Sequence, residues 1–281
     1  SLVSTSKSII KLTDISRIYD VGSERIHALD RVSAEIGENE YVAIMGQSGS
    51  GKSTLMNLLG CLDRATSGTY ELDGEDTTEM GNNALARVRN ERIGFVFQDP
   101  MTSLNPLHTI EKQISESILL HNKQLALAAI GSKKSKKTPL AIQNKVIELL
   151  SLVGIPNPEE RLSAYPHQLS GGQKQRVMIA MALANEPDVL IADEPTTALD
   201  VTVQKQVLEL IKSLQKKLEM SVILISHDLN IVKHYADSVA VMHHGKVIES
   251  GKTSDIFDSP KEAYTEKLIN SDPKGKAHPI P

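Results

Sequence analysis

The sequence contains little cysteine and few aromatic residues. Its 281 residues include one cysteine, Cys61, and no tryptophan, and aromatic residues make up 3% of the chain. A single cysteine excludes an intrachain disulfide framework and a cysteine-rich metal or iron–sulfur site. No apolar run approaches the length that crosses a bilayer, and the N-terminus lacks the apolar stretch of a signal peptide. These absences predict a soluble, cytosolic protein, which is still able to dock on a membrane protein.

An excess of positive charge is missing as well. The chain has 31 Lys and Arg residues against 35 Asp and Glu residues, for a formal net charge of -4. Nucleic-acid binding depends on a basic footprint that releases counterions, so we expect no nucleic-acid partner. The composition, 40% hydrophobic and 23% charged, is typical of a globular protein and excludes wholesale disorder.

Short apolar runs alternate with segments of helical periodicity. The runs at residues 41–45, 93–97, 189–192 and 222–225 predict buried strands, each followed by a loop with polar residues or glycine. An amphipathic helix is indicated by the apolar residues Val203, Val207, Leu210, Ile211, Leu214 and Leu218. This alternation predicts an α/β fold with a largely parallel sheet, whose carboxyl edge is where a ligand binds.

A phosphate-binding loop is the most specific motif. It follows the strand at 41–45 and consists of Gly46, Gln47, Ser48, Gly49, Ser50, Gly51, Lys52 and Ser53. The expected nucleotide-binding residues continue to Thr54, where a predicted helix starts that runs to about Gly60. Small residues let the backbone wrap around phosphates with its N–H groups inward, and the helix N-terminus adds positive potential. In this pattern the lysine reaches the β- and γ-phosphates and the last serine is placed for Mg²⁺. The alternative is a chance glycine-rich turn.

Two acids end the apolar strand at 189–192. Asp193 suits the coordination shell of Mg²⁺, and Glu194 is free to polarise an attacking water. The alternative is that both acids only cap the end of a strand. A phosphate-binding loop in the same chain favours the catalytic interpretation.

A third motif lies at residues 169–173, before a helical segment that leads to the acidic strand. It consists of Leu169 followed by Ser170, Gly171, Gly172 and Gln173. With all three motifs present, residues 9–269 resemble the ATP-binding cassette (ABC) family, the motor subunits of ABC transporters. The resemblance implies an α/β P-loop NTPase (RecA-like) core with an antiparallel β subdomain and an inserted helical subdomain. For residues 169–173 taken alone, the alternative interpretation is a surface helix with Ser170 as its N-cap.

The resemblance also implies roles for single residues, with ATP and Mg²⁺ as cofactors. Residues 170–173 would clamp the γ-phosphate held by the opposite subunit, and Gln98 would sense Mg²⁺ and the water. Asp200, in the loop that crosses the dimer interface, would complete the nucleotide site. His227 would contact the γ-phosphate, and Tyr19 would stack on adenine. For His227 and Tyr19 the alternatives are a polar strand end and an ordinary loop tyrosine.

The implied domain organisation is one nucleotide-binding domain over residues 1–270. Its core covers about 1–98 and 186–250, its helical subdomain about 99–185 with helices near 110–120 and 142–153, and its C-terminal helix about 260–270. Residues 271–281 are polar, carry three prolines, and are predicted to be a flexible tail or linker.

Two branches of the family are represented. Residues 56–70 and 93–98 resemble the macrolide-export and lipoprotein-release branch. The later part of the chain resembles oligopeptide and dipeptide importers, especially the microcin C type. This resemblance is carried by residues 100–109, the segment 165–168 before the signature, and residues 176–182, 196–201 and 264–269.

Because the surface after Gln98 receives the transmembrane partner in this family, the resemblance favours peptide import. Export, and less strongly a non-transport ABC ATPase, are the alternatives. The microcin C type carries two cassettes on one chain, so a tandem-cassette fragment and a hybrid both stay open.

The implied partners are transmembrane permease subunits, a second cassette in a homo- or heterodimer, and, through the permease, a peptide-binding protein. The implied location is the cytoplasmic face of the inner membrane.

Three remaining features favour structural interpretations. The pair His243 and His244, before Gly245, lacks a metal-ligand set and predicts a surface hairpin turn. Cys61 is expected to serve packing rather than reactivity. The lysines within 132–137 are expected to lie in a solvated loop.

Overall fold

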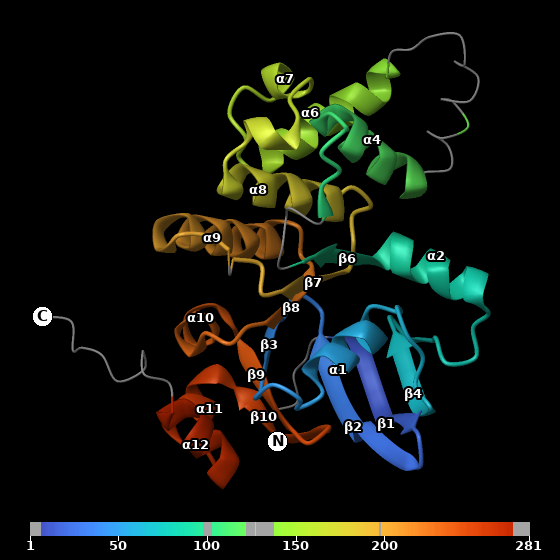
Figure 1. Cartoon of the computed structure of the whole chain (residues 1–281), viewed down its shortest axis with the longest axis vertical. Coiled ribbons are helices and arrows are strands. Elements are labelled where there is room, and N and C mark those ends of the chain that lie inside the picture. The colour runs from blue at the N-terminus through green and yellow to red at the C-terminus, as the bar shows by residue number, and fades with distance from the viewer. Residues whose placement is uncertain (1–6, 98–102, 122–126, 128–137, 197, 272–281) are drawn as a thin grey trace, which may run out of the picture. The chain divides into compact units, whose positions relative to one another are not determined.

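The computed structural model describes residues 7–97, 103–121, 127, 138–196 and 198–271. The chain forms two compact units, one made of Ser1–Arg89 with Gln215–Pro281 and the other of Asn90–Leu214. We refer to them as unit 1 and unit 2. Figure 1 labels their helices and strands.

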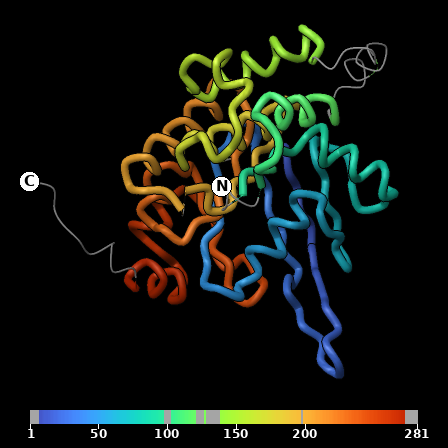
Figure 2. The backbone as a smooth tube through the Cα atoms, turned by 45° about the horizontal axis from the view of Figure 1, so that its top comes forward, coloured from blue at the N-terminus to red at the C-terminus, as the bar shows by residue number. Residues whose placement is uncertain are grey.

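Unit 1 contains an antiparallel sheet with the strand order β2-β1-β4-β5. Its strands are β1 (Ser8–Val21), β2 (Glu24–Gly37), β4 (Ser67–Leu72) and β5 (Glu75–Asp76). The hairpin of β1 and β2, in blue, is the long paired segment in Figure 2, and Tyr19 on β1 pairs with Ile26 on β2. Ile10, Leu12 and Leu72 bury one face of the sheet. The antiparallel β subdomain is therefore present as expected.

The second sheet segment of unit 1 is mainly parallel. β3 (Tyr41–Met45) pairs in parallel with β8 (Ser221–Ile225) and with β9 (Ser238–His243), and β10 (Lys246–Lys252) pairs antiparallel with β9. Every residue of β3 and β8 is buried, which explains why their sequences are continuous apolar runs. The helices of this region are α1 (Lys52–Leu59), α10 (Leu229–Tyr235), α11 (Thr253–Asp258) and α12 (Ala263–Asn270).

Unit 2 combines a two-stranded parallel pair with a group of helices. β6 (Ile93–Val96) pairs with β7 (Val189–Asp193). α4 (Ile110–His121), α6 (Leu140–Leu152) and α8 (Gly171–Ala182) pack on one another around Ile114, Val146 and Leu150. Two short elements, α7 (Pro158–Arg161) and the 3₁₀ helix η1 (Pro166–Gln168), precede α8. The Arg176 guanidinium donates to the Val153 carbonyl oxygen at 2.8 Å and ties α8 to the end of α6.

Two helices extend across the division between the units, α2 (Asn82–Arg92) and α9 (Val201–Lys217). α9 is the amphipathic helix predicted from the apolar periodicity, and Val207, Ile211 and Leu214 are buried. Among the residues that the structure describes, none of the helices has the length and apolar content that crossing a membrane requires.

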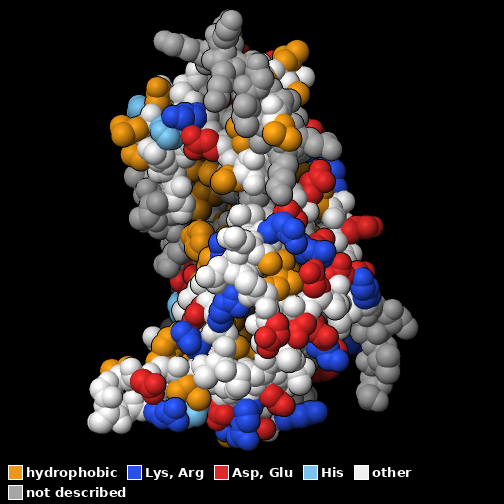
Figure 3. All heavy atoms as spheres, turned by 90° about the vertical axis from the view of Figure 1, so that its right-hand side faces the viewer, with side chains coloured by type: hydrophobic (Ala, Val, Ile, Leu, Met, Phe, Trp, Pro, Cys, Tyr) orange, Lys and Arg blue, Asp and Glu red, His pale blue; other side chains and the backbone are white. Residues whose placement is uncertain are grey.

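The four predicted strands and the helices near 110–120 and 142–153 are confirmed. Several ends differ by one or two residues: β6 stops at Val96 instead of Phe97, β7 continues to Asp193, β8 begins at Ser221, and α1 begins at Lys52, two residues before the predicted start. α1 starts early because Gly51 allows the chain to turn directly into the helix. Gln98, the lysines within 132–137 and the tail after Ser271 lie outside the described residues. Figure 3 shows acidic and basic side chains interspersed on one face, in keeping with the small net charge.

Candidate nucleotide-binding site

The loop of residues 46–51 connects β3 to α1 and leaves the N-terminus of α1 open. Gly51 is the N-cap of α1 with φ 103°, and none of the described side chains caps the helix with a hydrogen bond. The first N–H groups of an α-helix have no intrahelical partner, so this end offers donors to an anion. The Ser50 hydroxyl is buried and also has no hydrogen-bond partner in the described part of the chain. A phosphate group would satisfy both kinds of donor.

Two glycines in this loop are required by close backbone contacts. A Cβ atom on Gly51 would lie 2.6 Å from the Ala28 carbonyl oxygen, and one on Gly46 would lie 2.6 Å from that of Met242. Gly51 also has a left-handed φ that other residues adopt only with strain. The loop therefore holds its shape through backbone packing, which a side chain at either position would disrupt.

Lys52 and His227 meet at this loop. The Lys52 side chain is 6% exposed, its ammonium group donates to the Gly46 carbonyl oxygen at 2.5 Å, and Nζ lies 3.4 Å from His227 Nδ1. His227 follows β8 and is exposed, and Asp228 next to it caps α10 by accepting hydrogen bonds from the Asn230 and Ile231 amides. The structure thus brings together two residues that are 175 positions apart and that we predicted to contact the γ-phosphate.

Tyr19 lies near the end of β1 and is 37% exposed. The Arg17 guanidinium lies 4.4 Å from the centre of its ring, and the Tyr19 phenol donates to Asp63 Oδ2 at 3.2 Å. Arg17 Nε also donates to Asp63 Oδ2, at 3.0 Å. The hydrogen bond with Tyr19 and the charge of Asp63 raise the pKa of Arg17. Arg17 and Asp63 therefore fix the orientation of the tyrosine ring that we expect to stack on adenine.

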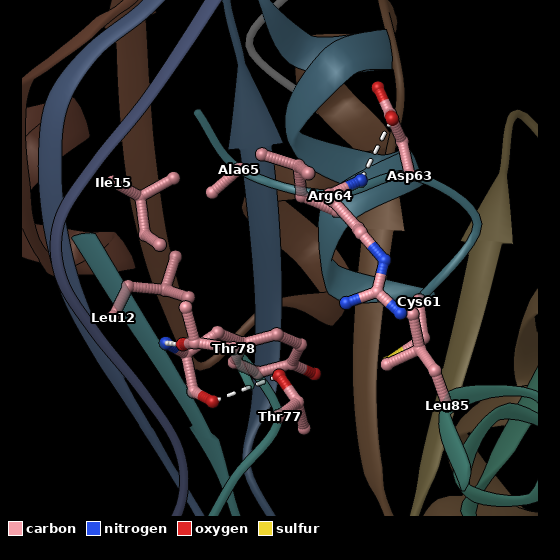
Figure 4. A pocket seen from close by; sticks show the side chains of 11 residues that line it. Leu12, Ile15, Cys61, Asp63, Arg64, Ala65, Thr77, Thr78 and Leu85 are labelled. Atoms are coloured by element: carbon pink, nitrogen blue, oxygen red, sulfur yellow. Dashed lines mark hydrogen bonds between the residues drawn. The ribbon is translucent and has the colours of Figure 1, made fainter. Parts of the chain in front are cut away.

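A small cavity of about 80 Å³ lies behind the segment that carries Asp63 (Figure 4). Leu12 and Ile15 of β1 line it together with Leu85 of α2 and the residues around Cys61 and Arg64. Burial raises the pKa of the Cys61 thiol to about 11, and its side chain is 2% exposed. Packing, the role expected for Cys61, fits this environment.

The signature segment forms the N-terminus of α8 in unit 2. Ser170 Oγ accepts a hydrogen bond from the Gln173 amide at 3.2 Å, and Gln173 Oε1 accepts one from the Ser170 amide at 3.0 Å. This is a reciprocal capping box. A Cβ atom on Gly172 would lie 2.5 Å from Val203 Cγ1, so a small residue is needed where α8 passes α9.

The acidic residues follow in the same unit. Asp193 ends β7, and Glu194 has a left-handed backbone with φ 45°. A residue with a β-carbon adopts this conformation at a cost, and such strain is concentrated at functional positions. Asp200 Oδ1 accepts a hydrogen bond from the Val203 amide at 3.0 Å and caps α9. Its helix-capping contact was not predicted from the motif.

The predicted site residues thus fall into two groups, one in each unit. Unit 1 holds Tyr19, the phosphate-binding loop and His227, while unit 2 holds the signature segment, the acidic pair and Asp200. Gln98 lies outside the described residues. Sequence reasoning missed the contacts of Arg17 and Asp63 with Tyr19, because nothing in the local pattern distinguishes them from other surface charges.

Sequence reasoning also missed a contact of the C-terminal helix. The Gln47 amide donates to the Tyr264 phenol oxygen at 3.0 Å, and the Tyr264 ring stacks on His243. His243 and His244 do form the expected hairpin turn between β9 and β10. His243, however, is half-buried against Tyr264, so its environment is not that of a simple surface turn. The only sequence signal was the resemblance of residues 264–269 to peptide importers.

Comparison with known proteins agrees with this geometry. The family model described as ABC transporter matches residues 29–197. The chain is 47% identical to the peptidoglycan transport ATP-binding protein YejF of Agrobacterium fabrum over 96% of this chain and 48% of that protein. It is 46% identical to the dipeptide transport ATP-binding protein DppD of Bacillus subtilis over 89% of this chain and 72% of that protein. The chain therefore spans about half the length of the Agrobacterium relative.

A solved structure extends the comparison to the fold. A dimeric ATP-binding cassette in a post-hydrolysis state, bound to ADP and Pi, superimposes with a TM-score of 0.73 and 33% identity, over 87% of this chain and 98% of that one. The expected fold class, a P-loop NTPase core with an antiparallel β subdomain and a helical subdomain, is confirmed. On this sequence, fold and site geometry, the chain belongs to the ABC transporter family as an ATP-binding cassette.

Proposed function

We propose that this chain is the ATP-hydrolysing motor subunit of an ABC transporter that imports peptides. The observation that carries the proposal is the open N-terminus of α1, with Lys52 Nζ 3.4 Å from His227 Nδ1 beside it. Two cationic or hydrogen-bonding side chains beside the N-terminal N–H groups of a helix suit the terminal phosphates of ATP. Tyr19, held by Arg17 and Asp63, would stack on the adenine ring.

The residues present also suit Mg²⁺. Ser53 is exposed in the first turn of α1, and Asp193 ends β7, so the chain supplies the hydroxyl and carboxylate oxygens that this ion prefers. We propose that Ser53, Asp193 and Gln98 hold it. When bound, Mg²⁺ neutralises charge on the β- and γ-phosphate oxygens.

For hydrolysis we propose that the Glu194 carboxylate orients the attacking water and accepts its proton. Gln98 helps to place that water. Lys52 and His227 bind the oxygens of the γ-phosphate, where negative charge develops during the transfer to water.

A second cassette would complete each site. We propose that residues 170–173 of one subunit bind the γ-phosphate held by the other, with Asp200 in the contact between them. The dimeric cassette with bound ADP and Pi supports this arrangement. Closure on ATP and reopening after hydrolysis would then move the permease through two states. A homodimer and a heterodimer with a different cassette both fit this scheme.

The transported substrate is proposed from the relatives. Those with high identity carry names of dipeptide, oligopeptide and peptidoglycan transport proteins. We infer that the chain docks on permease subunits at the cytoplasmic face of the inner membrane, and that a peptide-binding protein delivers substrate to the permease.

Glu194→Gln tests the hydrolytic role. We expect turnover, measured as phosphate release, to fall by about 100-fold or more while the variant still binds Mg·ATP. Light scattering should show a monomer that becomes a dimer only with Mg·ATP. Glu159→Gln, at an exposed glutamate on α7 of the same unit, is the control and should keep wild-type turnover. Undiminished turnover in Glu194→Gln would remove this residue from the role.

Reconstitution tests the substrate. With the permease in liposomes and the binding protein present, di- and oligopeptides should stimulate ATP hydrolysis. Stimulation by macrolides or lipoproteins instead would contradict import and favour export.

A further inference from the structure

The C-terminal helix α12 contacts the phosphate-binding loop directly. The Tyr264 phenol oxygen accepts a hydrogen bond from the Gln47 amide at 3.0 Å, although the two residues are 217 positions apart. The Tyr264 ring stacks on His243 with its centre 3.9 Å away and an angle of 26° between the planes. Gln47 is the second residue of the loop, so this contact lies beside the expected phosphate site.

His243 ends β9, directly before the turn at His244 and Gly245, and this hairpin packs against the same loop. The Gly245 amide donates to the Ser50 carbonyl oxygen at 2.9 Å, and the Met242 carbonyl oxygen limits the space at Gly46. The turn therefore contacts the loop near both of its ends. Tyr264 joins this turn and the loop, because its ring binds the turn and its oxygen binds the loop.

The position of Tyr264 is fixed from the start of α12. Glu249 on β10 accepts hydrogen bonds from the Lys261 amide at 2.8 Å and from the Glu262 amide at 3.2 Å, immediately before the helix begins. Burial of Glu249 works to raise its pKa, yet these hydrogen bonds bring the pKa of Glu249 below its usual value. Thr265, next to Tyr264, is fully buried. In Figure 1 α12 follows α11 in the red part of the chain, close to β10.

Stacking on His243 suits a neutral imidazole. Burial lowers the pKa of His243, and the neighbouring His244 ring, 3.9 Å away, lowers it further. Both effects favour the neutral form of the ring, which packs against the phenol as one aromatic group on another.

We propose that Tyr264 is a positioning residue for the phosphate-binding loop, so that α12 sets the affinity of the loop for nucleotide. The proposal rests on the proposed ATP-binding function. The hydrogen bond from the Gln47 N–H to Tyr264 restrains the backbone at the start of the loop, whose following N–H groups are expected to converge on phosphate. Tyr264 supplies the acceptor. Because coupling between two sites is reciprocal, bound nucleotide should in turn strengthen the docking of α12.

Tyr264→Phe tests this, since phenylalanine keeps the ring on His243 and removes only the acceptor. We expect the Kd for Mg·ATP, measured by calorimetry, and the KM of hydrolysis to rise about 3- to 10-fold, the usual worth of one hydrogen bond. We expect kcat to stay within about 2-fold, because groups at the reacting phosphate are unchanged. Tyr264→Leu, which also removes the stack, should show a larger rise.

The matched control is Tyr70→Phe. The Tyr70 phenol donates to the Leu59 carbonyl oxygen at 2.8 Å, a buried hydrogen bond in the same unit but at the other end of α1. This variant should have a lower Tm and an unchanged Kd for Mg·ATP. Hydrogen exchange adds a second measurement: Mg·ATP should slow exchange in residues 263–270 of the wild-type chain and have little effect there in Tyr264→Phe.

Two negative results are distinguishable. If the wild-type chain binds Mg·ATP and Tyr264→Phe binds it equally well while its Tm falls as in Tyr70→Phe, the tyrosine is only structural and this proposal is wrong. If the wild-type chain itself does not bind Mg·ATP, the proposed function fails and the positioning role fails with it.

Discussion

The two helices that we expect to bind phosphate begin in different ways. α1 in unit 1 begins after its N-cap Gly51, and none of the described side chains caps its N-terminal N–H groups. α8 in unit 2 begins at Ser170, whose side chain and that of Gln173 cap each other's backbone amides at 3.2 and 3.0 Å. One helix end is open, and the other is satisfied by its own residues.

This difference indicates different dependence on the ligand. The open end of α1 has N–H donors that none of the described side chains caps, so it is suited to hold the phosphates of a nucleotide in a single subunit. The capped end of α8 is stable without nucleotide, and it has to share or exchange its capping hydrogen bonds when a phosphate approaches. We infer that α1 binds first and that α8 joins later, when a second cassette is present.

The largest expected effect is a loss of Mg·ATP affinity caused by a change at the uncapped N-terminus of α1. Lys52→Ala removes the ammonium group next to the α1 N-terminus, and hydrogen bonds to charged groups are worth about 1.5–3 kcal/mol, so we expect Mg·ATP affinity to fall roughly 10- to 100-fold. Calorimetry on the monomer measures it. The control is Lys246→Ala, at a half-exposed lysine 3.4 Å from Asp30, which should bind normally. Equal loss in both variants would mean that net charge, and no specific lysine, governs binding.

A change at the capped N-terminus of α8 should lower the stability of the folded chain. Ser170→Ala removes the cap of α8 and should lower the free energy of unfolding by about 1 kcal/mol, measured with urea, and it should weaken dimerisation driven by Mg·ATP. Ser170→Asn restores a capping side chain and should recover the stability while dimerisation stays weak. If Ser170→Ala is as stable as the wild type, α8 does not depend on its cap, and the proposed difference between the N-termini of α1 and α8 is wrong.

A smaller loss of nucleotide affinity is expected from a change at Asp63, which orients the tyrosine that we expect to stack on adenine. Asp63→Asn weakens the contacts that orient Tyr19, and we expect about a 3-fold loss of affinity for ATP from the loss of one such hydrogen bond, with kcat unchanged. Inorganic triphosphate, which has no adenine, should bind the variant and the wild type alike. Asp20→Asn, at an exposed ion pair with Arg25, is the control. An equal loss of affinity for triphosphate would mean that Asp63→Asn alters the phosphate-binding loop and not the contact with adenine.

The smallest effect is expected at the opposite end of α1. With a pKa of about 11, roughly one Cys61 thiol in a thousand is ionised at pH 8, so iodoacetamide should react slowly in the folded chain and fast in denaturant. Cys61→Ser should leave Mg·ATP affinity within about 2-fold of the wild type, because the hydrogen bond from Arg89 is accepted by the backbone carbonyl of Cys61, which the substitution keeps. A large change in affinity would show that the C-terminal end of α1 also shapes the phosphate site.

Local signals made part of this structure predictable. β3 and β8 are buried along their whole length and therefore read as unbroken apolar runs. The phosphate-binding loop was predictable from its run of small residues, of which Gly46 and Gly51 are required by close backbone contacts. The cap of α8 was predictable because Ser170 and Gln173 are only three residues apart. The roles assigned to the site residues, from Tyr19 and the phosphate-binding loop to Glu194 and His227, remain predictions.

The sequence by itself determined the family, the positions of four buried strands and the motifs that we expect to bind phosphate, because each depends on residues that are neighbours in the chain. Only the tertiary structure decided which distant side chains support these motifs. Asp63 holds Tyr19 across 44 positions, and Tyr264 holds Gln47 across 217. A hydrogen bond of this kind depends on two segments meeting at about 3 Å with the right orientation, and no local pattern records that meeting. The fold brings these distant segments together, and their hydrogen bonds support the expected nucleotide site.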